Sequence, residues 1–157
     1  MNVGGLAALH AGKACLRAMA VLLAVAVFAP VQRAEAMEVR KDMGGSVEER
    51  LAEIARLEQA GTPVRIVGTC VSACTLYLGL STTCVKPGAR LGFHGPSTRL
   101  RGLPLPYEEF ERLSRLMAEK YPPAIRAWFM AEARMVTGDY ITISGAEAIR
   151  LGARPCA

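Results

Sequence analysis

The sequence predicts an α/β fold in which a mainly parallel sheet is built from repeated strand–helix crossover units. Short β-branched runs typical of buried strands alternate with longer segments of helical periodicity. Turns that contain glycine or proline separate these segments, and the sequence has no internal repeats or low-complexity tracts. Strands that alternate with helices form right-handed crossovers and therefore pair in parallel.

Residues 1–36 are predicted to be a secretory signal peptide and to take no part in the fold. Two basic residues precede an apolar run over residues 18–29, and Ala34-Glu35-Ala36 has the small-x-small pattern that signal peptidase accepts. The alternative is an anchor in the inner membrane, but about 12 apolar residues are few against the roughly 20 of a spanning helix. We therefore expect cleavage after Ala36 and a periplasmic or secreted bacterial protein.

Residues 37–157 are enough for a single domain with one core and too few for two domains. Removing the leader lowers the net charge from +5 to +3, because three basic residues and one acidic residue leave with it. Arg90, Arg99 and Arg101 cluster around His94, but no aromatic residues are interleaved with them as on surfaces that stack bases. We expect a solvated rim at these arginines and no nucleic-acid partner.

The first elements of the domain are a strand over residues 37–41 and a helix over residues 47–59. Ser46 can cap this helix, and Glu49, three residues further on, completes a capping box. Apolar residues fall on one side of the helix and most charged residues on the other. The sequence Ala-Gly-Thr-Pro at residues 60–63 ends the helix.

The middle of the chain is expected to hold three strands and one buried helix. Residues 64–68 are a β-branched run of the kind found in a strand that is covered on both faces. A mostly apolar helix follows over residues 72–80. Two more strands are expected over residues 83–86 and 90–93, on either side of a Pro-Gly turn, and the second ends at His94.

The composition changes beyond this histidine. Residues 96–106 hold prolines, a glycine and arginines without periodicity, which predicts an exposed loop. Helices are expected over residues 107–120 and 122–135, the second starting at Pro-Pro. Trp128-Phe129-Met130 on this second helix is interpreted as core or as an oligomer contact. Residues 141–152 indicate a short strand, a capped helical turn and a glycine stop.

Three features of the sequence together supply the groups that a serine hydrolase site requires. Gly44 and Gly45 form a turn that can point backbone N–H groups at an oxyanion, Ser72 opens a helix after a strand, and His94 ends the next strand. Ser72 alone is more typical of a helix cap, and His94 alone of a hydrogen-bonded structural residue. Their order and combination favour the interpretation as an active site.

Four cysteines remain in the mature chain, an even number in an export context where thiols tend to be oxidised. Cys70, Cys74, Cys84 and Cys156 allow three pairings, of which Cys74 with Cys84 is our single choice, because it would clamp the segment that carries the serine. The alternatives are a zinc site, for which the spacing is unusual and histidines are lacking, and a redox pair, whose motif normally has two intervening residues.

These motifs resemble those of the Clp protease proteolytic subunits, in the Clp/crotonase superfamily. Asp42-Met-Gly-Gly-Ser-Val is similar to their Asn-Ser-Pro-Gly-Gly-Ser-Val, Cys70-Val-Ser-Ala-Cys to their Ala-Ala-Ser-Met-Gly, and Phe93-His-Gly-Pro to their Ile-His-Gln-Pro. Ser144-Gly-Ala-Glu-Ala with the closing Leu151-Gly is similar to the end of that family. The resemblance spans nearly all of the mature chain and is strongest to small exported Clp-like proteins of bacteria.

The resemblance implies a role for each residue of the site. Ser72 would be the nucleophile, His94 the general base, and the N–H groups of Gly45 and Ala73 the oxyanion hole. Asp139 is the candidate orienter of His94. The family's catalytic aspartate aligns three or four residues before Asp139, so Asp139 would have to reach back to the ring.

The chain also departs from the family pattern. The leader ends a few residues before the Gly-Gly turn, so the first crossover unit is expected to be truncated at its N-terminal side. The segment after His94, where the family has the handle that joins two rings, is short and rich in proline, so a ring does not follow from the resemblance, although a homo-oligomer fits it. Outside the cytoplasm neither ATP nor an ATP-dependent unfoldase is expected, and no cofactor or metal is implied.

Three hypotheses about function follow. The first is an ATP-independent serine peptidase or esterase that acts on a peptide or an acyl group. The second is a catalytically inactive Clp-like domain that binds a peptide or a partner in the same groove. The third is a redox protein that uses Cys70 and Cys74, whose thiol exchange would survive Ser72→Ala.

Overall fold

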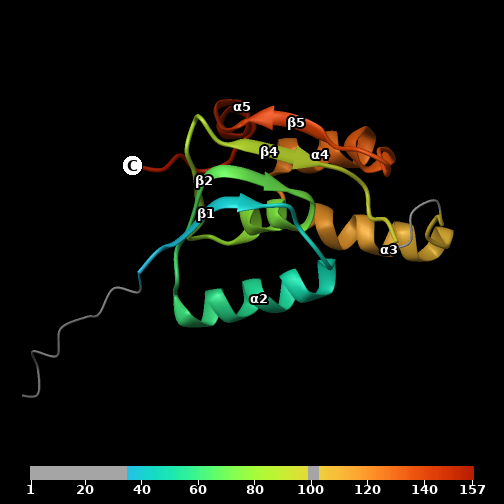
Figure 1. The fold of residues 1–157 in the computed structure, drawn as a ribbon, viewed down its shortest axis with the longest axis horizontal. Coiled ribbons are helices and arrows are strands. Elements are labelled where there is room, and N and C mark those ends of the chain that lie inside the picture. Colours follow the sequence, from blue (N-terminus) through green and yellow to red (C-terminus); the bar gives the residue numbers. More distant parts are fainter. Residues whose placement is uncertain (1–34, 99–102) are drawn as a thin grey trace, which may run out of the picture. The chain divides into compact units, whose positions relative to one another are not determined.

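The computed structural model describes residues 35–98 and 103–157 (Figure 1). All but the last two residues of the predicted signal peptide lie outside these ranges, as does the alternative membrane anchor over residues 18–29. Within the described residues, no helix has the length and apolar character that crossing a bilayer requires.

The described part of the chain is a mixed α/β structure, so the predicted fold class is confirmed at that level. Its elements are β1 (Met37–Asp42), α2 (Val47–Ala60), β2 (Val64–Val71), the 3-10 helix η1 (Ser72–Gly79), β3 (Cys84–Val85), β4 (Arg90–Phe93), α3 (Tyr107–Ala118), α4 (Pro123–Ala131), the 3-10 helix η2 (Ala133–Met135), β5 (Ile141–Ser144) and α5 (Gly145–Arg150). Two predictions need correction: η1 is a 3-10 helix, and the helix expected to reach residue 135 ends at Ala131, after which η2 forms a separate turn.

The sheet brings the ends of three strands together at one edge. Its strands lie in the order β1-β2-β4-β5, and β3 pairs separately with β2. The strands β1, β3 and β4 run parallel to β2, whereas β5 runs antiparallel to β4. Asp42 is paired with Cys70, and Val71 with Gly92. The segments that leave β1, β2 and β4 therefore emerge side by side, and carboxyl ends of parallel strands are where ligand sites form in open α/β sheets.

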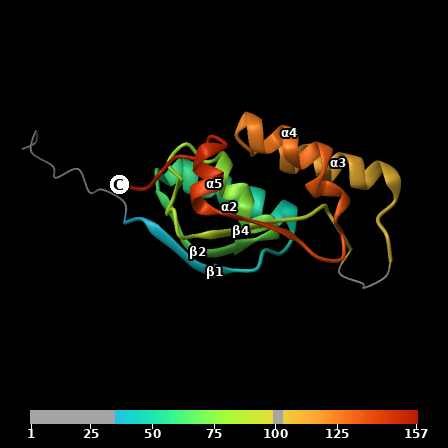
Figure 2. The same cartoon turned by 90° about the horizontal axis from the view of Figure 1, so that it is seen from above.

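The helices cover one side of the sheet, as Figure 2 shows for α2, α3, α4 and α5. On β2, Val64, Ile66 and Cys70 point into the core and are fully buried. Arg65 and Val67, which alternate with them, are only half-buried. Since successive side chains of a strand point to opposite faces, full burial of residues 64–67 applies to one face of β2, and Val71 at the end of the strand is buried as well. The expectation that this strand is covered on both faces is therefore wrong.

Helix α2 begins and ends where its sequence signals indicate. The hydroxyl of Ser46 accepts a hydrogen bond from the Glu49 N–H at 3.3 Å, which is the capping contact expected of this pair. Gly61 follows the helix with φ +62° and its N–H donates to the last turn. Ile54 lies at the centre of the apolar side and is 2 % exposed. The helix is thus held against η1 and the sheet by the stripe that its periodicity predicted.

Aromatic rings join α4 to the sheet. Phe129 is fully buried, and its ring contacts that of Tyr121 edge-on at 5.1 Å. Trp128 lies edge-on to Phe93 of β4 at 5.3 Å, and it is only partly buried. Such edge-to-face pairs add about 0.5–1.5 kcal/mol to the burial of the rings. These residues therefore belong to the core, which is one of the two interpretations that the sequence allowed.

Candidate functional site

Ser72 lies on a sharp turn between β2 and η1. It follows Val71, the last residue of β2, directly and is the first residue of the 3-10 helix. Its φ is +60°, and among the described residues it is the one non-glycine residue with a positive φ. A serine in this region of backbone space carries strain of about 1–3 kcal/mol, which persists only where surrounding contacts hold it. A strained turn from strand to helix is also how serine hydrolases expose a nucleophile.

The first contact that holds this turn is a disulfide between Cys70 and Cys74, which lie on either side of Ser72. Both cysteines are fully buried, and their Cα atoms are 5.3 Å apart. A covalent bridge over four residues limits the conformations that the intervening serine can adopt. The disulfide therefore helps to hold the backbone of the turn that carries Ser72.

A buried chain of hydroxyl groups holds the other side of the turn. The Thr75 hydroxyl donates to the Ser72 carbonyl oxygen at 2.7 Å, so its hydrogen is used there. The Tyr121 hydroxyl, 2.8 Å from the same Thr75 oxygen, must then be the donor of that pair. Burial raises the pKa of Tyr121 above its usual value, which keeps its hydroxyl protonated. Tyr121, beyond the end of α3, thus fixes the backbone of Ser72 through Thr75.

The second disulfide joins Cys84 to Cys156, so the predicted bridge between Cys74 and Cys84 is wrong. Cys84 is paired with Arg65 at the start of β2, whereas Cys70 and Cys74 lie at and beyond the end of that strand. A strand rises about 3.3 Å per residue, so Cys84 is about 16 Å from the position of Cys70 along the sheet. All four candidate cysteines are bonded, which is compatible with an oxidising, extracytoplasmic environment.

The C-terminal segment reaches Cys84 through backbone pairing. The Cys156 N–H donates to the Val85 carbonyl oxygen at 3.0 Å, and the Val85 N–H donates to the Arg154 carbonyl oxygen at 2.8 Å. This tail therefore lies along β3, which places Cys156 beside Cys84. No sequence signal in the short tail revealed this pairing, because it depends on the path of a segment 72 residues away.

The Gly-Gly turn is packed directly against the serine. A Cβ atom added to Gly44 would lie 2.5 Å from the Ser72 Cβ, 2.8 Å from the Val71 carbonyl oxygen and 2.9 Å from the Ala73 nitrogen. No side chain fits there, and the φ of Gly44 is +92°. Gly45, with φ +145°, has open space around it instead. The first glycine is thus needed for contact with the nucleophile turn, and the second for its backbone conformation.

His94 follows β4 and is half-buried. Its Nδ1 lies 2.6 Å from the carbonyl oxygen of Gly95. Because a carbonyl oxygen only accepts hydrogen bonds, Nδ1 must carry the proton. The lone pair of the neutral ring is then on Nε2, which is the tautomer that a general base requires.

Ser72, His94 and Gly45 line one pocket of about 310 Å³. The structure therefore brings these three predicted residues to a common space, although no hydrogen bond joins the Ser72 and His94 side chains within the described part of the chain. Ala73 does not line the pocket, but it lies directly after Ser72, and its N–H belongs to the first turn of η1, where backbone donors lack helical acceptors.

Asp139 lies apart from this pocket. Its carboxylate is exposed and accepts a hydrogen bond from the Tyr140 N–H at 2.8 Å. The Gly95 N–H, next to His94, donates to the Val136 carbonyl oxygen at 2.8 Å. The residue that contacts the histidine segment is therefore Val136, three residues before Asp139. Within the ranges that the structure describes, no hydrogen bond joins Asp139 to His94.

Several pocket residues were not singled out by the sequence. Leu113 and Met117 form an apolar wall from α3, and Glu48 contributes a carboxylate from the first turn of α2. The helical periodicity of residues 107–120 predicted a helix there but not its position over the serine. A hydrogen bond from its own backbone N–H, followed by bonds from Arg112 and Ser46, lowers the pKa of Glu48, so its carboxylate is ionised at neutral pH and forms an ion pair with Arg112.

The predicted arginine rim is described only in part. Arg90 is exposed, whereas Arg99 and Arg101 lie outside the described residues. In the described ranges, no three side chains of His, Cys, Asp or Glu are grouped so that they could hold a metal ion.

Comparison with solved structures gives a similarity in fold. The chain is similar to the crystal structure of the ClpP protease catalytic domain from Plasmodium falciparum, with 14 % sequence identity over 90 % of this chain and 76 % of that one, and a TM-score of 0.51. No family model and no curated protein sequence matches the chain. Identity this low shows the fold alone, which is therefore Clp-like.

Proposed function

We propose that the chain is an extracytoplasmic serine hydrolase of the peptidase type that works without ATP. The observation that carries the proposal is the conformation of Ser72, which is held with φ +60° on a strand-to-helix turn and lines the same pocket as His94 and Gly45. A structural cap residue gains nothing from a strained backbone, whereas a nucleophile gains exposure of its hydroxyl.

In the proposed reaction Ser72 attacks the carbonyl carbon of a peptide or acyl ester. His94 Nε2 accepts the serine proton as the C–O bond forms, and the carbonyl π electrons move to the oxygen. The N–H groups of Gly45 and Ala73 bind that oxyanion. When it collapses, the leaving amine or alcohol takes the proton from His94, and an acyl-serine remains. Water, deprotonated by His94, then releases the acid and restores the serine.

The described group that orients His94 is a backbone carbonyl, where serine hydrolases usually have a carboxylate. The Gly95 carbonyl oxygen fixes the tautomer of His94, but a neutral oxygen stabilises the imidazolium less than a carboxylate does. We propose that this carbonyl suffices for a slow hydrolase. The alternative, in which the Asp139 carboxylate orients the ring, stays a prediction that the substitution Asp139→Asn tests.

The proposed location and partners follow from the same features. The disulfides support a periplasmic or secreted protein, as the predicted signal peptide does. The proposed substrate is a peptide or an acyl ester. The proposed reaction uses no cofactor, metal or ATP-dependent unfoldase, and no nucleic-acid partner is proposed. We also propose that the protein can form a homo-oligomer, which need not be a ring.

A second candidate function is a catalytically inactive Clp-like domain that binds a peptide in the same pocket. The observation that favours it is the His94 ring, whose described hydrogen bond goes to a backbone carbonyl and not to Ser72 or to a carboxylate. Such a domain would keep the pocket and lose the proton transfer.

Labelling with a fluorophosphonate separates the two functions, because this reagent phosphonylates only an activated serine. We expect the purified protein with both disulfides formed to be labelled at Ser72, which mass spectrometry of the peptide locates. Ser72→Ala removes the site, and His94→Ala should slow labelling by at least about 10³-fold. A folded protein that is never labelled, but binds peptides, would support the inactive domain.

A further inference from the structure

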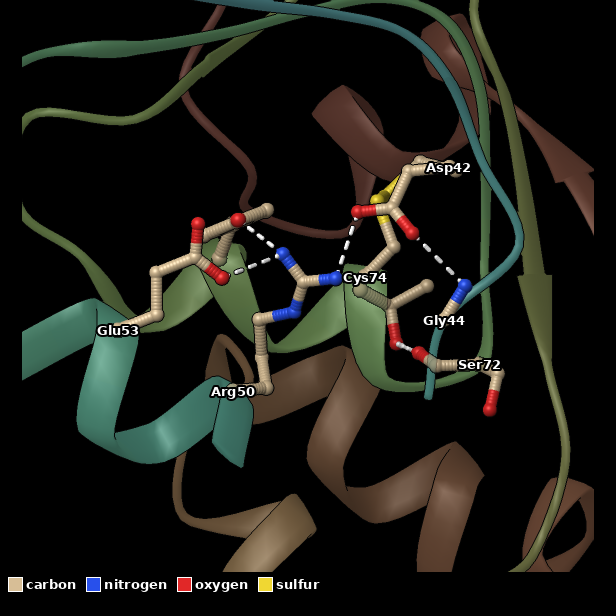
Figure 3. A network of polar contacts seen from close by, with 9 residues as sticks. Asp42, Gly44, Arg50, Glu53, Ser72 and Cys74 are labelled. Atoms are coloured by element: carbon tan, nitrogen blue, oxygen red, sulfur yellow. Dashed lines mark hydrogen bonds and ion pairs between the residues drawn. A yellow bond between two sulfur atoms is a disulfide. The ribbon is translucent and has the colours of Figure 1, made fainter. Parts of the chain in front are cut away.

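A partly buried ion pair ties the turn that carries Gly45 to helix α2 (Figure 3). Arg50 Nη2 lies 2.7 Å from Asp42 Oδ2, and Arg50 Nη1 lies 2.9 Å from Glu53 Oε2. The side chains of Arg50 and Asp42 are only 11 % and 22 % exposed. Asp42 is the last residue of β1, and its neighbours Gly44 and Ser72 appear in the same view.

The two oxygens of the Asp42 carboxylate have different partners. Oδ2 contacts Arg50, whereas Oδ1 accepts a hydrogen bond from the Gly44 N–H at 2.8 Å. The Gly44 N–H is therefore occupied and cannot serve as an oxyanion donor. The N–H of Gly45, which lines the pocket, has no acceptor among the residues that the structure describes.

The contact with Asp42 matters because Gly44 is otherwise free to rotate. Glycine populates both positive and negative φ, so a Gly-Gly turn by itself does not fix the direction of an N–H group. Here the Gly44 nitrogen is bonded to Asp42, and its Cα is packed against Ser72. With these two points held, the peptide plane that carries the Gly45 N–H starts from a fixed position.

The rest of the network directs Arg50 toward Asp42. The Arg50 guanidinium lies 4.4 Å from the centre of the Tyr77 ring and also contacts its hydroxyl. Burial, and then the neighbouring Glu53, raise the pKa of Tyr77 above its usual value, so this hydroxyl is neutral and the charge of Arg50 is balanced by the two carboxylates. Each carboxylate receives a different nitrogen of the fork, which fixes the plane of the guanidinium.

We propose that Asp42, held by Arg50, is a positioning residue that aims the Gly45 N–H at the oxyanion formed on Ser72. This inference rests on the proposed function, since it assigns a part of that same site. Asp42 itself touches no reacting atom and acts through the turn. Its removal should therefore weaken the transition state and leave the binding of the ground state almost unchanged.

Fluorophosphonate labelling measures this effect directly, because the phosphonyl oxygen occupies the place of the oxyanion. The rate constant kinact and the binding constant KI are determined for the protein with both disulfides formed and for three variants. For Asp42→Ala we expect kinact to fall by about 10²-fold, the effect of losing one oxyanion donor, with KI within about twofold. For Asp42→Asn, whose amide oxygen still accepts from Gly44, we expect a fall of only about 3- to 10-fold.

Glu53→Gln is the matched control, because it removes one negative charge from the same arginine without touching the glycine turn. We expect its kinact to stay within about twofold of the parent protein, since the amide oxygen can still accept from Arg50 Nη1 and the bond between Asp42 and the Gly44 N–H is untouched. A role of Asp42 in stability alone would lower the thermal unfolding temperature of the Asp42 variants and leave kinact of the folded protein unchanged. Circular dichroism and thermal unfolding establish that each variant is folded.

The outcomes separate this inference from the proposed function. If the parent protein is labelled and Asp42→Ala is labelled at the same kinact, the positioning role is overturned and the hydrolase remains. If the parent protein is folded and never labelled, the proposed function fails, and the positioning role fails with it. If Asp42→Ala does not fold, Asp42→Asn and Glu53→Gln decide: a slower kinact for Asp42→Asn supports the inference, and equal kinact values overturn it.

Discussion

The two walls of the pocket are held in different ways. The wall that carries Ser72 is fixed by the Cys70–Cys74 disulfide, by the hydroxyl of Thr75 and by the close packing of Gly44. On the wall that carries His94, the described hydrogen bond of the ring goes to the carbonyl of the next residue, whose N–H in turn donates to the Val136 carbonyl oxygen. The serine is thus held directly by a disulfide, a hydroxyl and a packed glycine, whereas the histidine ring has one described hydrogen bond, to its own backbone segment.

The difference indicates that the serine and the oxyanion donors are the preorganised part of the site. Oxyanion donors are effective only if they are in place before charge develops, and holding them there requires support from surrounding structure. A histidine needs a defined tautomer, which a single hydrogen bond supplies. Substitutions away from the pocket should therefore act on the serine wall much more than on the histidine wall.

The largest effect is expected from Gly44→Ala. The added methyl would meet the Ser72 Cβ and two backbone atoms, so the turn and the nucleophile must move apart. We expect fluorophosphonate labelling to fall by more than about 10³-fold, since both donors and the serine are displaced. Gly45→Ala is the comparison, because its methyl meets nothing and only backbone strain opposes it. Equal labelling of Gly44→Ala and the parent protein would show that this contact does not position the serine.

A smaller effect is expected from removing the disulfide at the serine. Cys70→Ala with Cys74→Ala should slow labelling by about 10- to 100-fold, as the strained turn loses its clamp. The loop-entropy estimate gives a loss of only about 2 kcal/mol in the free energy of unfolding for so short a loop.

The bridge between Cys84 and Cys156 serves as the control for this experiment. It closes a loop of 72 residues at the other end of β2, so its removal should cost about 4 kcal/mol in stability. The labelling rate of the variant without this bridge should not change while the protein is folded. Chemical denaturation measures the loss of stability of each double variant, and labelling kinetics measure the loss of reactivity of Ser72, so the two effects can be compared. If they do not, the serine wall gains no specific support from its disulfide.

The smallest effect is expected from Asp139→Asn on the histidine wall. The Asp139 carboxylate is exposed and bonded to the next backbone N–H, so we expect the labelling rate to change by less than about threefold. A carboxylate that orients a catalytic histidine is instead worth about 10⁴-fold in rate. A loss near that size would make Asp139 the third member of a triad and would contradict the view that the histidine wall is held by Gly95 alone.

Local signals predicted the elements well. The capping pair Ser46 and Glu49 marked the start of α2, and the strand over residues 90–93 has the bounds expected. These features depend on neighbours a few residues apart. The alternation of strands and helices likewise predicted parallel pairing of β1, β2 and β4, which places their following segments at one edge.

Long-range contacts were predicted poorly. The pairing of Cys84 depends on the path of the C-terminal tail along β3, which no local pattern specifies. The ion pair of Asp42 with Arg50 was also missed, because Arg50 lies on the charged side of α2 and was expected to be solvated. A charged residue at one end of an amphipathic helix is normally exposed, whereas Arg50 is partly buried because it contacts Asp42 of β1 and Tyr77 of η1.

The sequence by itself determined the α/β class, the element order and the set of residues that could form a hydrolase site, because periodicity, caps and turn residues act over short distances. Only the tertiary structure decided that Ser72 is held at a positive φ, that Gly44 packs against it, and that His94 receives a backbone carbonyl as its partner. The physical reason is that backbone angles and side-chain orientations at these turns depend on contacts such as that of Gly44 with Ser72, which join segments far apart in the chain and are set by how the strands pair.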